Sequence, residues 1–149
     1  MHILIACDHG ALELKQHLLA WFASRTDFII TDLGTSSSLP VDYPDLASRL
    51  CQDLLTHKAE AGILLCGTGL GMSIAANRFP GIRATLCHDE YTARLSRQHN
   101  NANVLVLGGR TTGKATAEGI LEVWLTTPFE GGRHQTRLDK IESGCSPRE

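Results

Sequence analysis

A cysteine followed at once by a glycine-rich turn is the feature of this 149-residue chain that most clearly suggests chemistry. The apolar run ILLC ends at Cys66, and the turn GTGLG (residues 67–71) leads into a helix-like segment. Glycines at alternating positions let backbone N–H groups turn toward an anion, and a helix start adds partial positive charge. The same field would favour the Cys66 thiolate. The competing interpretation is that Cys66 only packs as a small hydrophobe and that the Thr68 hydroxyl only caps the helix.

The glycine turn does not fit the common nucleotide-binding or phosphatase loops. A dinucleotide fingerprint requires a third glycine where Met72 stands, and a P-loop ends in lysine followed by serine or threonine. A cysteine-dependent phosphatase requires an arginine after five intervening residues, and Met72 again occupies that place. The sequence therefore predicts an anion-binding loop that is not a nucleotide loop.

The rest of the chain predicts the framework that would position this turn. Short apolar runs rich in β-branched residues alternate with helical patterns, which is typical of right-handed βαβ units in an open parallel sheet with helices on both faces. The predicted strands are residues 2–7, 28–32, 61–66, 82–87 and 103–108, and the predicted helices are residues 10–24, 42–57, 70–78, 89–98, 112–126 and 134–142. Asp42 is a candidate cap for the second helix, and Thr111 or Thr112 for the fifth.

A parallel sheet of this kind binds ligands at the carboxyl ends of its strands, so the residues after each strand predict a site. These residues are Cys7-Asp8-His9-Gly10, Gly34-Thr35-Ser36, the glycine turn after Cys66, His88-Asp89 and Gly108-Gly109-Arg110. We expect an acid, an imidazole, a thiol, a hydroxyl and a guanidinium at one edge. Neither Cys7-Asp8-His9 nor Cys87-His88-Asp89 has an established metal-ligand spacing, so no metal site is predicted.

Basic residues near the C-terminus predict a second anion-binding group. Arg133 and Arg137 are four residues apart and share one face if their segment is helical. Together with Arg110 or His9 they would suit the dianionic end of a phosphate monoester, whereas the alternative is an ordinary solvated face. His99 follows a helix, where a lone histidine is more often structural than catalytic.

Composition limits the classes of partner and compartment. The chain is 42% hydrophobic and carries 14 basic and 16 acidic residues, a net charge of −2 without a long run of one sign. Nucleic acid and membrane surfaces are therefore poor candidates as partners, and no stretch has the length of a transmembrane helix. Five scattered cysteines without a CxxC pair favour a reduced, cytoplasmic protein. One domain is expected over residues 1–142, with residues 143–149 as a flexible tail that carries an incidental thiol at Cys145.

Several longer segments, taken together, resemble one known family. CDHGALELK, DYPDLA, GILLCGTGLGMSIAANR, GIRA, LSRQHNNANVLVLGGR and FEGGRHQTR occur in this order from the first predicted strand to about residue 141. This combination closely resembles type B ribose-5-phosphate isomerase. The resemblance implies a Rossmann-like five-stranded parallel sheet, and an interconversion of ribose 5-phosphate and ribulose 5-phosphate in the pentose phosphate pathway that needs no metal or organic cofactor. It also implies a homodimer or dimer of dimers with active sites shared between subunits.

The resemblance also implies a role for each matching residue. Cys66 matches the general base, and another branch of the family has a glutamate base where this chain has Met72. Gly67, Thr68, Gly69 and Gly71 match the loop that stabilises the enediolate, and His99 matches the residue that opens the sugar ring. Asp8 matches a contact to the sugar oxygens near His99, and Asn100 matches a contact to a sugar hydroxyl or to the oxyanion. The matching phosphate contacts are His9, Arg110, Arg133 and Arg137. His88 and His134 receive no role.

Two alternatives remain at this level. Relatives of the family act on six-carbon phosphates such as allose or galactose 6-phosphate, because an added carbon changes the depth of the pocket more than the catalytic groups. A different class is a non-catalytic nucleotide-binding α/β domain in which the glycine turn only holds a ligand. That interpretation leaves Cys66, His99 and the paired arginines unexplained together.

Overall fold

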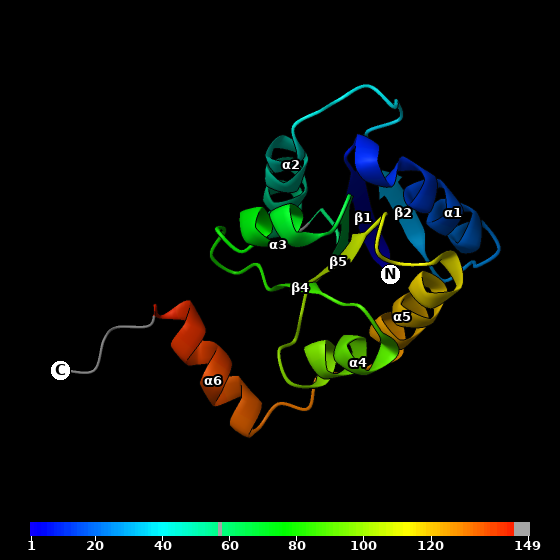
Figure 1. The fold of residues 1–149 in the computed structure, drawn as a ribbon. Coiled ribbons are helices and arrows are strands. Elements are labelled where there is room, and N and C mark those ends of the chain that lie inside the picture. The colour runs from blue at the N-terminus through cyan, green and yellow to red at the C-terminus, as the bar shows by residue number, and fades with distance from the viewer. Residues whose placement is uncertain (57, 145–149) are drawn as a thin grey trace.

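Five parallel strands form the centre of the molecule in a computed structural model that describes residues 1–56 and 58–144 (Figure 1). In spatial order they are β2 (Ile29–Asp32), β1 (His2–Cys7), β3 (Ala61–Cys66), β5 (Val104–Gly108) and β4 (Ala84–Leu86). The register pairs Cys7 with Leu65, and Cys66 with Gly108. The ends of β1, β3 and β5 are therefore level at one edge of the sheet.

Helices cover both faces of this sheet, as the sequence predicts. The covering helices are α1 (Leu12–Ala23), α2 (Tyr43–Leu55), α3 (Leu70–Ala76), α4 (Glu90–Gln98) and α5 (Lys114–Thr126), and a further helix is α6 (Arg133–Glu142). Side chains alternate across each strand, so Ile63 and Leu65 pack in one buried cluster with residues of α1, α4 and α5. Leu64 and Cys66 pack in a second cluster with residues of α2 and α3. The α/β class, the five parallel strands and the two helical layers are thus confirmed.

The strands and helices depart from the prediction mainly at their ends. β2 lies at the edge of the sheet and is not buried on both faces, since Ile29 is 67% exposed. The predicted cap at Thr111 or Thr112 is wrong because both backbone N–H groups bond to the Gly108 carbonyl in a turn, and Gly113 takes the N-cap position of α5. Asp42 does occupy the N-cap position of α2, but its side chain makes no capping hydrogen bond.

Helix α6 is set apart from the other helices and extends beyond the end of the sheet (Figure 1). It is attached through Leu138, which is 4% exposed, and through an ion pair of 2.9 Å between Arg83 Nη1 and Glu142 Oε1. Ile141 on the same helix is 56% exposed. The predicted tail continues past Gly144 into residues 145–149, which lie outside the described residues, as does Cys145. Among the described helices, none has the length and apolar character needed to cross a membrane.

Candidate active site

Three strand ends bring Asp8, Cys66 and Arg110 together. The Asp8 N–H donates to Leu65 O at 3.1 Å, Gly109 N–H to Cys66 O at 2.8 Å, and Arg110 N–H to Gly67 O at 2.9 Å. A Cβ on Gly67 would lie 3.4 Å from three guanidinium atoms of Arg110, so that side chain lies directly over the start of the glycine turn. The predicted convergence at the carboxyl edge is therefore found for this acid, thiol and guanidinium.

The thiol of Cys66 is held by the turn that follows it. The Gly69 N–H donates to Cys66 Sγ at 3.1 Å, and the side chain is 5% exposed. Gly69 is the N-cap residue of α3 with a φ of 80°, a left-handed conformation that brings its N–H back toward the sulfur. The turn therefore places a backbone donor directly on the sulfur of Cys66.

The Thr68 hydroxyl does not cap α3 in the way considered above, because Gly69 occupies the N-cap position. Thr68 Oγ1 accepts a long hydrogen bond of 3.4 Å from the Leu70 N–H, and the residue is exposed. Its hydroxyl is therefore free to contact a ligand above the turn. Met72, at the position of the alternative base, is fully buried among α2 and α3 residues.

The other described cysteines have different surroundings. Burial raises the pKa of the Cys7 thiol to about 11 and that of Cys51 to about 11, and it also raises the pKa of Cys87. Cys7 and Cys51 are fully buried, and Cys87 is 1% exposed. These thiols behave as small apolar groups at neutral pH. Of the four described cysteines, Cys66 is the one whose sulfur accepts a backbone hydrogen bond from the glycine turn.

Asp8 and His9 lie at the same edge, where β1 ends. Asp8 is 8% exposed, and its Oδ1 accepts the Gly10 N–H at 2.8 Å, which caps a short 3-10 turn over His9–Ala11. His9 is exposed, and its Nδ1 lies 3.4 Å from the Val41 N–H in the loop before α2. At the end of β4, Asp89 instead caps α4 by accepting the Thr92 N–H at 2.7 Å, so that carboxylate has a structural role.

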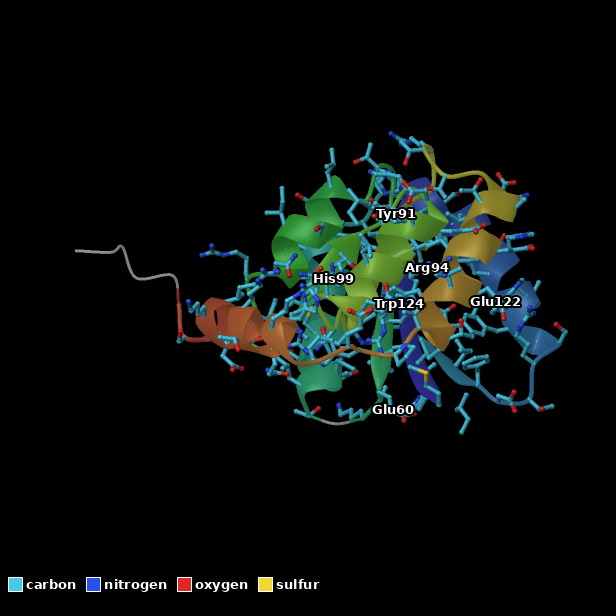
Figure 2. The ribbon with its side chains drawn as sticks, turned by 90° about the horizontal axis from the view of Figure 1, so that it is seen from below. Glu60, Tyr91, Arg94, His99, Glu122 and Trp124 are labelled. Carbon is cyan, nitrogen blue, oxygen red and sulfur yellow. The ribbon has the colours of Figure 1, made fainter. Side chains whose placement is uncertain are left out.

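The remaining predicted site residues lie at the opposite edge of the sheet. Helix α4 runs back from the carboxyl end of β4, and His99 is its C-cap residue. Just beyond it, Asn103 O accepts the N–H of Gly62 at the start of β3, and Asn103 N–H donates to Arg83 O before β4. Figure 2 shows His99 on the side of the molecule that carries α6, away from Tyr91 and Arg94. His99 and the exposed Asn100 therefore belong to the amino edge of the sheet.

The two arginines of α6 extend this second group. Arg133 and Arg137 are both exposed and four residues apart on the helix, which confirms the predicted common face. The Glu130 N–H donates to Gln98 O at 3.0 Å and so ties the start of this region to the end of α4. The structure thus divides the predicted residues between two edges, and at about 3.3 Å per residue along β3 these edges are about 16 Å apart.

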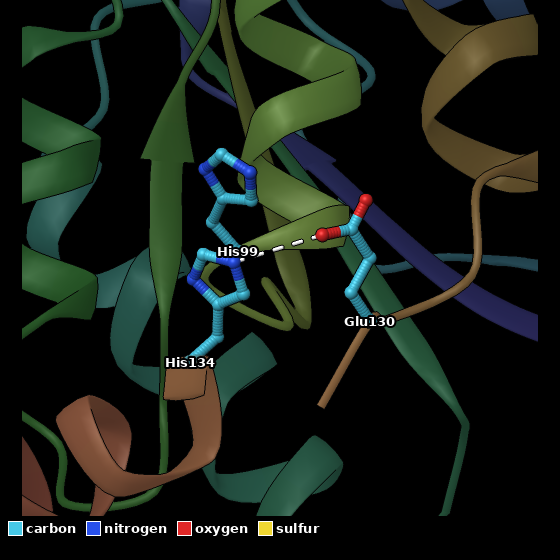
Figure 3. Close-up of side chains that lie close together, drawn as sticks. All are labelled: His99, Glu130 and His134. Atoms are coloured by element: carbon cyan, nitrogen blue, oxygen red, sulfur yellow. Dashed lines mark ion pairs between the residues drawn. The ribbon is translucent and has the colours of Figure 1, made fainter. Parts of the chain in front are cut away.

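Three side chains beside the predicted residues were given no role from the sequence: Tyr43, Glu130 and His134. The ring of Tyr43, in the segment DYPDLA, lies against Gly71, where an added Cβ would be 2.6 Å from Tyr43 Cζ. His134 stacks on His99, and Glu130 lies close to both (Figure 3). The side-chain ligand atoms of His99, Glu130 and His134 lie within 4.8 Å of one another, so this is a group whose residue types could hold a metal ion.

Comparison with known proteins gives consistent matches over nearly the whole chain. A family model described as Ribose/Galactose Isomerase matches residues 3–141. Ribose-5-phosphate isomerase B of Escherichia coli (strain K12) is 46% identical over 139 residues, which is 93% of each protein. The solved structure of a ribose 5-phosphate isomerase from Thermotoga maritima superposes with a TM-score of 0.93 at 51% identity and covers 95% of this chain and 97% of its own. The structure of ribose-5-phosphate isomerase B from Mycoplasma genitalium, solved with bound ribulose-5-phosphate, superposes with a TM-score of 0.89 at 40% identity. The match covers 95% of this chain and 94% of the Mycoplasma chain.

Proposed function

The chain belongs to the ribose/galactose isomerase family, and on this basis we propose that it interconverts ribose 5-phosphate and ribulose 5-phosphate through an enediolate, without a metal or organic cofactor. The observation that carries the proposal is the Cys66 thiol at the carboxyl edge, held by the Gly69 N–H at 3.1 Å between the ends of β1 and β5. An aldose–ketose isomerisation needs such a base beside a loop of fixed donors.

Cys66 is the general base in this proposal. Its thiolate takes the proton from C2 of the open-chain aldose and returns it to C1, so that the carbonyl moves from C1 to C2. The negative charge that develops on the enediolate oxygens requires donors that are already in place. The N–H groups of the 67–71 turn and the exposed Thr68 hydroxyl are the donors nearest to Cys66 in sequence and fold. The buried Met72 leaves Cys66 as the candidate base in this turn.

His99 is proposed to open the sugar ring before this step. Ribose 5-phosphate exists mainly as a furanose, so a group must deliver a proton to the ring oxygen while the hydroxyl at C1 loses one. An imidazole can do both near neutral pH. Asn100, exposed beside His99, is assigned to a sugar hydroxyl, and Asp8 is assigned to sugar oxygens near the opened ring.

The phosphate is assigned to His9, Arg110, Arg133 and Arg137. Guanidinium groups match the geometry of phosphate oxygens and bind them through charge-assisted hydrogen bonds. The exposure of all four side chains is consistent with a ligand role. Fixing this distant group would hold C1 and C2 of the sugar beside Cys66.

The division of these residues between two edges supports a site completed by a second copy of the chain. One copy would contribute the carboxyl-edge group with Cys66, and the other the amino-edge group with His99, Asn100 and α6. Leu70 and Ile74, one turn apart on α3, are 59% and 69% exposed next to the glycine turn. Such an exposed apolar pair is typical of a surface that another chain covers. We therefore propose a homodimer or a dimer of dimers.

The cellular setting follows from the proposed reaction. An enzyme that exchanges these two pentose phosphates would serve the pentose phosphate pathway. The four described cysteines are free and buried, which supports a reducing compartment such as the cytoplasm.

The test of the substrate is a comparison of catalytic efficiencies in the presence of EDTA. We expect the wild-type protein to convert ribose 5-phosphate with a larger kcat/KM than allose 6-phosphate or galactose 6-phosphate. A six-carbon phosphate favoured by about tenfold, or roughly 1.4 kcal/mol of transition-state binding, would instead assign the enzyme to the six-carbon branch. Binding of AMP or ATP without turnover of any sugar phosphate would favour the non-catalytic alternative.

A further inference from the structure

A stacked pair of imidazoles links two parts of the chain that are far apart in sequence. The ring of His134, in the first turn of α6, lies parallel to that of His99 at the end of α4, with 4.1 Å between the centroids and 8° between the planes (Figure 3). His134 is 4% exposed and is the more buried of the two. The contact therefore fixes the face of the His99 ring from one side and leaves its edge, with the ring nitrogens, available.

Glu130, in the loop before α6, lies beside the ring of His134. Its Oε2 is 3.6 Å from His134 Nε2, within ion-pair range but too long for a good hydrogen bond. Among the described residues His134 Nε2 has no hydrogen-bond partner and is buried. The backbone of Glu130 is itself anchored, because its N–H donates to Gln98 O at 3.0 Å beside His99. The loop, the two rings and the end of α4 thus form one connected unit.

The charges around this pair favour a neutral His134. Burial lowers the pKa of His134, and the nearby His99, Arg133 and Arg137 lower it further, whereas Glu130 opposes them. A neutral aromatic face can stack on either a neutral or a protonated imidazole, and it attracts the protonated form. His99 could therefore gain and lose a proton without leaving the stack.

The same group is less suited to hold a metal ion as it stands. The lone pair of an imidazole nitrogen lies in the plane of the ring, so an ion bound by both histidines must lie in both planes. Two rings stacked within 8° of parallel do not share such a point unless one of them turns. The stacking therefore favours a role for His134 in orienting the His99 ring.

We propose that His134 is a positioning residue for His99, and that its stacked ring holds the His99 imidazole in the plane from which it reaches the furanose oxygen. This inference rests on the proposed function. General acid–base catalysis depends on a hydrogen-bond geometry that a free side chain adopts only part of the time. A ring that is held on one face loses this freedom before the sugar arrives.

The experiment compares His134→Leu, which removes the stack, with His134→Phe, which keeps a flat ring of similar size. His17→Leu is the matched control, because His17 also pairs with a carboxylate, Glu118, at 2.6 Å, but on another surface. Each variant is assayed with ribose 5-phosphate, which must be opened, and with ribulose 5-phosphate, which has its C5 oxygen esterified and stays acyclic. Thermal unfolding of each variant establishes that it is folded.

We expect His134→Leu to lower kcat for ribose 5-phosphate by roughly tenfold or more, with KM and the consumption of ribulose 5-phosphate changed less than about threefold. His134→Phe should restore kcat to within about threefold of the wild type, and His17→Leu should match the wild type. The inference is overturned if His134→Leu behaves as the wild type, if His134→Phe is as impaired as His134→Leu, or if both sugars are affected equally. A wild-type protein inactive on both pentose phosphates would instead refute the proposed function.

Discussion

The division of the site between two edges of the sheet makes a quantitative prediction for mixed variants. Cys66→Ala removes the proposed base from the carboxyl edge, and the double variant Arg133→Ala/Arg137→Ala removes two proposed phosphate ligands from the amino edge. Along β3 these edges are about 16 Å apart, so one chain does not bring the two groups together by itself. Each variant alone should be nearly inactive, since every site in the proposed homodimer then carries a lesion.

A mixed dimer of the two variants should contain one site with both lesions and one site with neither. Random assembly makes half of the dimers mixed, and each has one intact site of two, so activity should return to about a quarter of the wild type. The assay is co-refolding of the two chains in equal amounts, followed by measurement of ribulose 5-phosphate formation.

The matched control mixes Cys66→Ala with Arg110→Ala. Both lesions lie at the carboxyl edge, where the Arg110 guanidinium covers Gly67, so every site in a mixed dimer keeps one lesion. We expect no recovery in this mixture. Absence of recovery in the first mixture, with mixed dimers present, would refute the shared site. Equal recovery in both mixtures would show that the two edges do not act as separate halves.

Four further predictions concern single properties of the chain. His99→Asn should slow turnover of ribose 5-phosphate more than that of acyclic ribulose 5-phosphate, and equal losses in the two assays would remove its ring-opening role. Arg137→Ala should raise KM by roughly tenfold or more with a smaller change in kcat, as expected for lost phosphate binding, and an unchanged KM would contradict that assignment. Gly69→Ala should lower the free energy of unfolding by about 2 kcal/mol or more, because φ is 80° and the new Cβ would overlap Leu86 Cδ1. Gly131→Ala is the control, since its φ is 64° but the space around it is open, so it should lose only the free energy of the strained backbone. Urea titration of both variants measures the difference. The pKa of Cys7 and that of Cys51 are about 11 in the folded chain, above the ordinary value of 9.0. The free energy of unfolding should therefore be fully retained below pH 9 and decrease by about 3 kcal/mol toward pH 10, because the thiols of the unfolded chain ionise first. A denaturant midpoint that stays constant as the pH is raised from about 8 to about 10 would contradict this.

The sequence was sufficient to predict the sheet and its helices because their signals are local. The run AGILLC is buried on both faces in β3, and the spacing of Arg133 and Arg137 gives one face of α6. The thiol, the carboxylate and the guanidinium of the carboxyl edge lie at the end of a strand or within two residues of one, so a parallel sheet brings them together whatever the details of packing. This half of the site could therefore be predicted from order along the chain.

The other features depend on contacts that no local pattern encodes. His99 follows a helix that runs back along the sheet, so its distance from Cys66 depends on topology and not on the residues around it. His134 meets His99 across 35 positions of sequence, and a single histidine in a helix start gives no sign of that contact. The prediction of a cap at Thr111 or Thr112 was wrong for a related reason. Both have side chains suited to capping, but their backbone N–H groups take part in the turn after β5, and α5 begins later, with Gly113 as its N-cap residue.

The most direct test of the whole account is the formation of ribulose 5-phosphate from ribose 5-phosphate, in EDTA, by the wild type and by Cys66→Ala side by side. We predict turnover by the wild type that is lost in the variant, while the variant keeps its fold and still binds the sugar phosphate. Full activity of folded Cys66→Ala would contradict the assignment of Cys66 as the base, and a folded but inactive wild type would contradict the proposed reaction.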